Sequence, residues 1–205
     1  MKTLDVDTPH GPARAHVHRA TSARGALVLG HGAAGGVASR DLQTARDVAL
    51  SEGLSVVLVE QPYRVAGRRS PAPAAQLDTG WTAVVGCLLR GVLDGLPLVV
   101  GGRSSGARVA CRTARTTGAV GVLCLAFPLQ PARRANAPAP PPSRLPELDA
   151  VTVSTLVVQG ARDPFGIPPS GPNRTVVQVS GDHSLRTDLG AVADAIRAWL
   201  PTVVA

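Results

Sequence analysis

A serine set between two glycines is the first feature of this sequence that could carry out chemistry. The segment GGRSSGARVA contains the pattern G-x-S-x-G from Gly102 to Gly106, directly after the apolar run LVV. On a sharp turn from a strand into a helix, this pattern exposes the serine hydroxyl, and the two glycines avoid collisions with neighbouring elements. The pattern makes Ser104 a candidate nucleophile, although the same residues also fit a glycine-rich turn in which serine only caps a helix.

An acid and a base follow two later apolar runs. The segment TLVVQGARDPFG ends in a turn with Asp163, and TVVQVSGDHSL ends in a turn with His183. If these runs are parallel strands, both turns lie with Ser104 at the carboxyl edge of one sheet, in the chain order Ser, Asp, His. Asp182 adjoins His183, but adjacent side chains in an extended turn point apart, so we expect Asp163 to be the acid. Taken alone, Asp163 also fits a turn-forming Asp-Pro pair, and His183 also fits a surface histidine. Neither explanation accounts for the placement of both residues after neighbouring strands.

A segment of small residues, LVLGHGAAGG, is a candidate oxyanion-binding turn. We expect the backbone N–H groups of Ala33 and Ser105 to face the negative charge that develops on a carbonyl oxygen when serine attacks it. The letters GHGAAG also fit the dinucleotide-binding pattern G-x-G-x-x-G, with Glu60 as the acidic residue that such a site requires. That alternative leaves the G-x-S-x-G segment without an explanation.

Neither a cofactor nor a metal ion is expected. His10, His16 and His18 belong to N-terminal segments that should be remote from the serine, and His31 is better placed to shape the oxyanion turn. No pair of histidines or acidic residues has the spacing of metal ligands together with a plausible third ligand. His183 therefore remains as the candidate base.

These residues can meet only if the chain forms a parallel sheet, and its pattern favours one. Short apolar runs alternate with stretches of helical length and spacing, which is typical of βαβ units. We expect strands at 4–6, 13–18, 26–29, 56–59, 98–100, 120–127, 156–158 and 176–179, and helices at 39–51, 74–93, 105–116 and 188–200. The first two strands flank a turn-rich segment, so they should form an antiparallel pair at one edge.

The expected architecture is a single α/β domain over residues 1–205, with a mainly parallel eight-stranded sheet and helices on both faces. A chain of this length can bury a large core. Because 44% of the residues are hydrophobic but only 2% are aromatic, that core should be packed from Ala, Val and Leu. The proline-rich segment 128–146 is expected to form a loop near the active site, since proline excludes a long helix, and it is too short for a cap domain.

Charge and cysteine content indicate which binding partners and which cellular location to expect. The formal net charge is +7, but Lys2 is the only lysine and the arginines are scattered without a basic block. We therefore expect no specific nucleic-acid partner. Cys87, Cys111 and Cys124 lie in apolar segments without CxxC spacing, which predicts reduced, buried thiols. No signal-peptide pattern and no apolar run of membrane-spanning length is present, so a cytoplasmic protein without a membrane partner is expected.

The segments GHGAAGG, GGRSSGARVA, LCLAFPLQP, LVVQGARDPFG and GDHSL together resemble the small α/β-hydrolases, especially the KANSL/testis-expressed-type branch related to dienelactone hydrolases. The resemblance spans most of the chain. It implies the α/β-hydrolase fold and a catalytic triad on Ser104, Asp163 and His183. Dienelactone hydrolases use a cysteine where this chain has Ser104, so a dienelactone substrate is not expected.

The activity implied is hydrolysis of a small carboxylic ester or thioester through an acyl-enzyme on Ser104. Some eukaryotic relatives of this branch are subunits of protein complexes. The alternative is therefore a non-catalytic scaffold or interaction protein with the hydrolase fold. The complete set of serine, acid, base and flanking glycines favours the enzyme. The sequence leaves the natural substrate and the oligomeric state open.

Overall fold

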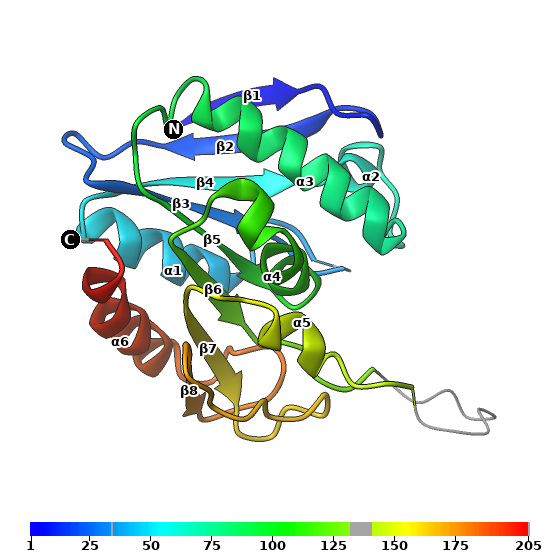
Figure 1. The fold of residues 1–205 in the computed structure, drawn as a ribbon, viewed down its shortest axis with the longest axis vertical. Helices are drawn as coiled ribbons and strands as arrows, with labels where there is room; N and C mark the ends of the chain where they lie inside the picture. Colours follow the sequence, from blue (N-terminus) through cyan, green and yellow to red (C-terminus); the bar gives the residue numbers. More distant parts are fainter. Residues whose placement is uncertain (34, 132–140, 205) are drawn as a thin grey trace.

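The computed structural model describes residues 1–33, 35–131 and 141–204, which form an eight-stranded sheet between two layers of helices (Figure 1). The strands are β1 (Lys2–Val6), β2 (Ala13–His18), β3 (Gly25–Gly30), β4 (Leu54–Glu60), β5 (Leu98–Arg103), β6 (Gly121–Leu125), β7 (Ser154–Gly160) and β8 (Arg174–Val179). Their order across the sheet is β1-β2-β4-β3-β5-β6-β7-β8. Strand β2 is antiparallel to β1 and β4, and the other neighbouring pairs are parallel. This confirms the predicted sheet and its antiparallel edge pair.

The chain reverses its direction of travel across the sheet at β3. Strand β4 lies on one side of β3 and β5 lies on the other, so the turns after β3 and β5 leave the same carboxyl edge side by side. Gly30, the last residue of β3, pairs in register with Gly102 of β5. In open α/β sheets, such a switch point forms the crevice in which ligands bind. The topology thus brings together the two glycine-rich segments that the sequence singled out.

Helices cover both faces of the sheet, as predicted. On one face lie α1 (Arg40–Ser51), α6 (Leu189–Trp199) and the 3-10 helix Leu200–Thr202, and on the other lie α2 (Pro62–Val65), α3 (Ala74–Leu89), α4 (Ser105–Thr117) and α5 (Leu145–Asp149) (Figure 1). Each layer buries mainly Ala, Val and Leu side chains against the strands. Trp81 and Phe127 are the largest fully buried side chains. The core is therefore of the aliphatic kind that the composition predicts.

Several predicted element boundaries differ from the structure. The helix predicted at 74–93 ends at Leu89, because the chain then turns and Leu93 N–H bonds back to the Leu88 carbonyl oxygen. The strand predicted at 120–127 ends at Leu125, because Ala126 has a φ of +51° that breaks the extended run. Helices α2 and α5 were not predicted, since elements of four and five residues are too short to show helical periodicity.

Part of the proline-rich segment 128–146 is described, and residues 132–140 of it lie outside the described residues. Its last two residues are not loop, because α5 begins at Leu145 with Pro146 in the first turn, where the missing N–H of proline costs no hydrogen bond. At its start, Gln130 N–H donates a 2.7 Å bond to the Phe165 carbonyl oxygen. The first residues of the segment therefore lie next to the turn that follows β7.

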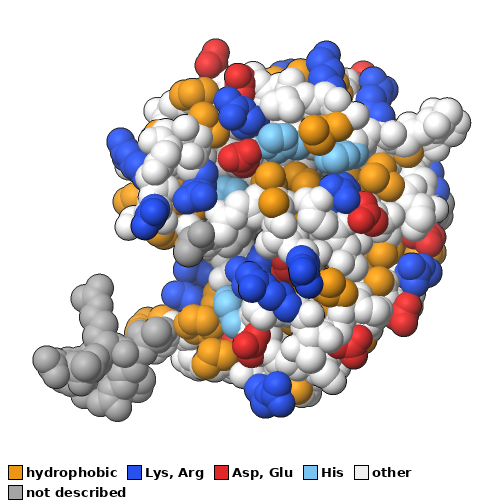
Figure 2. All heavy atoms as spheres, turned by 180° about the vertical axis from the view of Figure 1, so that it is seen from behind, with side chains coloured by type: hydrophobic (Ala, Val, Ile, Leu, Met, Phe, Trp, Pro, Cys, Tyr) orange, Lys and Arg blue, Asp and Glu red, His pale blue; other side chains and the backbone are white. Residues whose placement is uncertain are grey.

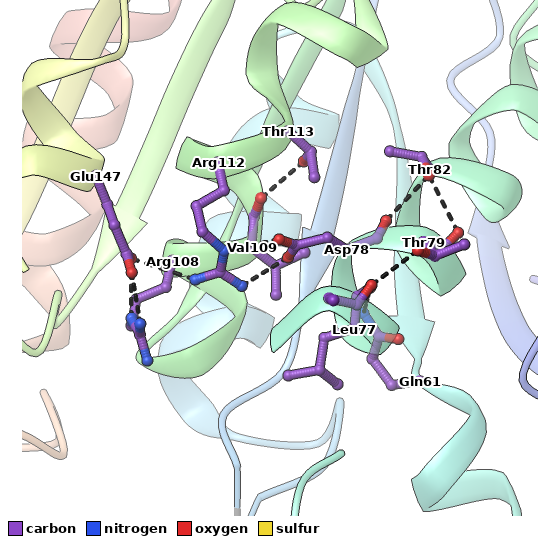
Figure 3. A network of polar contacts seen from close by, with 11 residues as sticks. Gln61, Leu77, Asp78, Thr79, Thr82, Arg108, Val109, Arg112, Thr113 and Glu147 are labelled. Atoms are coloured by element: carbon purple, nitrogen blue, oxygen red, sulfur yellow. Dashed lines mark hydrogen bonds and ion pairs between the residues drawn. The ribbon is translucent and has the colours of Figure 1, made fainter. Parts of the chain in front are cut away.

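A network of charged side chains joins α3, α4 and α5 (Figure 3). Arg112 of α4 donates to both carboxylate oxygens of Asp78 in α3, at 2.8 and 2.6 Å, and to Glu147 in α5 at 3.2 Å. Arg108, one turn earlier, donates to both oxygens of Glu147. Burial lowers the pKa of Arg112, but the hydrogen bonds and charge of Asp78 raise it overall. The network holds α4, the helix that begins beside Ser104, against its two neighbours.

The three cysteines differ in exposure. Cys111 and Cys124 are buried, with their Sγ atoms 3.5 Å apart. Cys87 is exposed, so the prediction that it is buried is wrong: α3 turns Val84, Val85 and Leu88 toward the sheet and leaves Cys87 outside that face. In the described ranges, no helix combines the length and apolar character needed to cross a bilayer.

Candidate active site

Ser104 lies on the turn that joins β5 to α4. Its φ of 51° and ψ of −107° fall outside the backbone regions that residues with side chains normally occupy. Its N–H donates a 2.9 Å bond to the Leu125 carbonyl oxygen of the neighbouring strand. A non-glycine residue held in this way stores backbone strain, which is most often found at functional sites. Helix α4 begins at the next residue, so the positive end of its dipole lies at this turn.

Gly102 and Gly106 allow this turn to pack directly on β3. A β-carbon at Gly102 would lie 2.5 Å from the Gly30 carbonyl oxygen and 2.7 Å from the backbone of Gly106. A β-carbon at Gly106 would lie 2.3 Å from the same Gly30 oxygen. All three distances are far shorter than van der Waals contact, so neither position accepts a side chain without movement of the strand. The two glycines stand where the sequence expects them, and for the expected steric reason.

Ser104, His183 and Asp163 form a continuous chain of hydrogen bonds. His183 Nε2 lies 2.9 Å from Ser104 Oγ, and His183 Nδ1 lies 2.8 Å from Asp163 Oδ2. Because a carboxylate can only accept, Nδ1 carries the ring proton and Nε2 accepts the serine O–H. The Asp163 side chain is fully buried, and 18% of the His183 side chain is exposed. The fold therefore brings together the three residues that the sequence proposed as nucleophile, base and acid.

Two residues that the sequence reasoning missed hold the acid and the base in place. Gln159, fully buried in β7, donates from Nε2 to Asp163 Oδ2 at 2.7 Å and to the Phe127 carbonyl oxygen at 3.1 Å. Phe165 donates its N–H to Asp163 Oδ1 at 2.9 Å, and its ring contacts the His183 ring edge-on at a centroid distance of 4.6 Å. The glutamine that directly follows the apolar run LVV in β7 was the one available signal.

Asp182, the rival acid, bonds to Ser184 and not to the imidazole. Its Oδ1 accepts the N–H of Ser184 at 2.8 Å and the hydroxyl of Ser184 at 2.6 Å. These hydrogen bonds lower the pKa of Asp182, so it stays ionised in a local turn. The geometry agrees with the preference for Asp163, because the carboxylate nearest His183 Nδ1 belongs to Asp163.

His31 locks the turn that follows β3. Gln61 N–H donates to His31 Nε2 at 3.1 Å, so the ring proton resides on Nδ1, which lies 2.8 Å from the Gly32 carbonyl oxygen. Burial lowers the pKa of His31 and so favours this neutral ring. A trans peptide holds its C=O and N–H on opposite sides, so the bond to Gly32 also sets the direction of the Ala33 N–H. The Tyr63 hydroxyl donates to the Ala33 carbonyl oxygen at 2.9 Å.

The backbone amides of Ala33 and Ser105 are available to a ligand. Within the described part of the chain, neither N–H donates a hydrogen bond. The turn that carries Ala33 lies beside the nucleophile, since a β-carbon at Gly32 would be 3.6 Å from Ser104 Cβ. Ser105 is the first residue of α4, where a helix N–H has no partner within the helix. Their use as an oxyanion hole stays a prediction.

Arg103, directly before Ser104, ties three segments of the site together. Its Nη2 donates to the His183 carbonyl oxygen at 3.1 Å. Its Nε lies 2.9 Å from Oδ2 of Asp41, a buried carboxylate in the first turn of α1. The contact is an ion pair without the alignment of a hydrogen bond. Nothing in the sequence pattern indicated this role, because the residue between glycine and serine in G-x-S-x-G is unrestricted.

The remaining candidates from the sequence do not join this site. A dinucleotide site would need Glu60, but Glu60 Oε1 lies 2.6 Å from Nε2 of His16 in β2. His18 is also in β2, and His10 is in the turn before that strand. Across the described residues, no three His, Cys, Asp or Glu side chains are grouped as a metal ion requires.

Comparison with known proteins places this geometry in a family. Residues 23–190 match the family described as an alpha/beta hydrolase domain. Similar solved structures include a serine hydrolase without a lid from Xanthomonas campestris (19% identity, 98% of this chain and 95% of that chain, TM-score 0.75). Est1E from Butyrivibrio proteoclasticus (15%, 100% and 99%, TM-score 0.81) and dienelactone hydrolase from Anabaena variabilis (15%, 100% and 98%, TM-score 0.76) are also similar. No match was found among curated proteins. These likenesses show the α/β-hydrolase fold that the sequence predicts.

Proposed function

The chain belongs to the alpha/beta hydrolase domain family, and from this premise we propose that it is a serine hydrolase that cleaves a small carboxylic ester or thioester through an acyl-enzyme on Ser104. The observation that carries the proposal is the hydrogen-bonded chain from Asp163 through His183 to Ser104, at 2.8 and 2.9 Å. A helix-capping serine has no need of a histidine and a buried carboxylate hydrogen-bonded in line beside it. The named activities of the similar structures agree with this proposal.

The mechanism uses each side chain in turn. His183 Nε2 takes the proton as Ser104 Oγ bonds to the substrate carbonyl carbon, and the carbonyl oxygen becomes an anion held by the Ala33 and Ser105 amides. The bond to the leaving group then breaks, and His183 gives the proton to the departing oxygen or sulfur. Water attacks the acyl-enzyme in the same way, which releases a carboxylic acid and restores Ser104. Asp163 keeps the imidazole in the required tautomer and stabilises its charged form.

The experiment that tests this proposal is labelling with a fluorophosphonate probe, which reacts only with an activated serine. The wild-type protein is expected to be labelled, and Ser104→Ala is expected to lose all labelling while its thermal unfolding stays similar. Ser105→Ala is the matched control, because it removes the adjacent hydroxyl and keeps the backbone N–H. Absence of labelling in the folded wild-type protein would favour the alternative, a non-catalytic scaffold. A series of p-nitrophenyl esters and thioesters then defines the acyl group.

The proposal also includes the family branch, the domain organisation, the location and the partners of the protein. We place the chain in the KANSL/testis-expressed-type branch, on the strength of the segments quoted from its sequence. Its organisation as one domain over residues 1–205, its location in the cytoplasm and the absence of a specific nucleic-acid partner remain predictions from the sequence. A small-molecule ester or thioester is the expected partner.

A further inference from the structure

A basic hollow lies beside the proposed nucleophile. Its volume is about 230 Å³. The lining residues that matter here are Ser39 and Arg40 at the start of α1, the paired Asp41 and Arg103, and Ser184 and Arg186 on the turn after His183. Figure 2 shows basic side chains around a hollow on one face of the molecule, with a histidine at its border.

Two residues that line the hollow are adjacent in sequence to the proposed nucleophile and base. Arg103 directly precedes Ser104, and Ser184 directly follows His183. The guanidinium of Arg103 bonds to the His183 carbonyl oxygen, and its Nη1 would lie 2.8 Å from a β-carbon placed at Gly32. A substrate with its carbonyl carbon at Ser104 therefore has the hollow within reach of a short chain of atoms.

The charge of the hollow is only partly compensated. Asp41 balances Arg103, with the two charged groups 2.9 Å apart. Arg40 and Arg186 form no ion pair with any other described residue. Arg40 and Arg186 both line the hollow, so two uncompensated positive charges border the same space. Arginine binds carboxylate and phosphate oxygens through paired N–H donors, so such oxygens are the ligands that this arrangement fits.

A separate observation at Ser39 points the same way. Its hydroxyl is buried, yet it has no hydrogen-bond partner within the described part of the chain. Ser39 precedes the first residue of α1 but makes no capping bond to that helix. A buried hydroxyl without a partner costs free energy. Because Ser39 lines the hollow, rotation of its side chain toward the hollow would let an anionic oxygen accept its hydrogen bond. The free N–H groups and dipole at the start of α1, a helix of 12 residues, also favour negative charge there.

We propose that this hollow is the subsite for an anionic oxygen group of the substrate, either a carboxylate or a phosphate. The inference rests on the proposed function and narrows it: the preferred substrate is an ester or thioester that carries a negative charge a few atoms from the carbonyl that Ser104 attacks. Arg40 and Arg186 bind the anion, while Arg103 keeps its contacts with Asp41 and His183. Because both free arginines are exposed, they can fold over the ligand when it binds.

The kinetic test compares matched substrates. The mono-p-nitrophenyl ester of glutaric acid is paired with its neutral methyl ester, and a phosphate-bearing p-nitrophenyl ester forms the second anionic arm. The wild-type protein is expected to show at least tenfold higher kcat/KM for one of the anionic esters. Arg40→Gln and Arg186→Gln are each expected to lower this ratio about tenfold, mainly through KM, as the loss of one charged hydrogen bond predicts. Arg197→Gln, an arginine of α6 outside the hollow, should leave the ratio unchanged.

The outcomes separate the two proposals. Equal kcat/KM for charged and neutral esters, or a ratio that Arg40→Gln and Arg186→Gln leave unchanged, overturns the anion subsite and leaves the hydrolase intact. If the protein hydrolyses no ester and takes up no fluorophosphonate, the hydrolase proposal fails. Calorimetry with glutarate and with inorganic phosphate then tests whether the hollow binds an anion, independently of any hydrolase activity. Saturable binding that weakens with added salt and in both variants supports the subsite, and no heat of binding with either anion overturns it.

Discussion

Gln159 and Asp163, four residues apart at the carboxyl end of β7, are joined by a 2.7 Å hydrogen bond from Gln159 Nε2 to Asp163 Oδ2. The same oxygen lies 2.8 Å from His183 Nδ1. The glutamine amide thus shares one carboxylate oxygen with the imidazole. Because Gln159 also bonds to the Phe127 carbonyl oxygen, it fixes the carboxylate relative to the neighbouring strand.

Gln159→Leu is expected to lower kcat by about 10- to 100-fold, with a smaller change in KM, because losing a donor to a buried carboxylate costs roughly 1–3 kcal/mol. Steady-state kinetics on any accepted ester check this, with thermal unfolding to show that the variant is folded. Gln178→Leu is the matched control, since Gln178 pairs with Gln159 in register on β8 but is exposed. An unchanged kcat in folded Gln159→Leu would show that Asp163 needs no support from this residue.

The three cysteines should differ sharply in reactivity. Cys87 is exposed. The hydrogen bond between Cys124 and Cys111, together with burial, raises the pKa of Cys124 well above its usual value. One thiol per folded chain is therefore expected to react with a disulfide reagent near pH 8, and three after unfolding in urea. Cys87→Ser should abolish the reaction of the folded protein. Rapid reaction of a second thiol in that variant would show that the Cys111–Cys124 pair is open to solvent.

His31 should make stability depend on pH. Burial lowers the pKa of His31 in the folded state below the unfolded value of 6.5, so the unfolded chain binds the proton more readily. The stability that neutral His31 contributes is present above pH 6.5 and is lost as the pH falls through the folded-state pKa. We expect the loss of unfolding free energy between pH 7 and pH 5 to be smaller in His31→Asn than in the wild-type protein. Urea titrations at both pH values measure it.

His10→Asn provides the control for that comparison, because His10 is exposed in the turn between β1 and β2. It should keep the pH dependence of the wild-type protein. The prediction is contradicted if His31→Asn loses as much stability as the wild type on acidification. His18, whose pKa is also lowered by burial, accounts for part of any dependence that remains.

The sequence predicts those elements that are marked by a local pattern of residues. Alternating apolar runs predict the strands, and the glycines at 102 and 106 predict a turn that packs on its neighbour. The supports of the site depend instead on contacts between distant segments. Asp41 meets Arg103 only because α1 starts beside the turn after β5, and no local pattern marks that pair. The role of Gln159 likewise depends on the turn after β7 folding back over its own strand.

The sharpest test of the acid compares Asp163→Asn with Asp182→Asn. Asparagine at 163 keeps the size of the side chain, but it removes the negative charge and adds donors next to His183 Nδ1, which favours the wrong tautomer. We expect kcat to fall by about 10³- to 10⁴-fold, as is typical when the acid of a triad becomes an amide. Asp182 contacts Ser184 instead, and asparagine keeps an acceptor oxygen for that turn, so Asp182→Asn should cost less than about tenfold. Both variants must show wild-type circular dichroism, and a larger loss in Asp182→Asn would transfer the role of acid to Asp182.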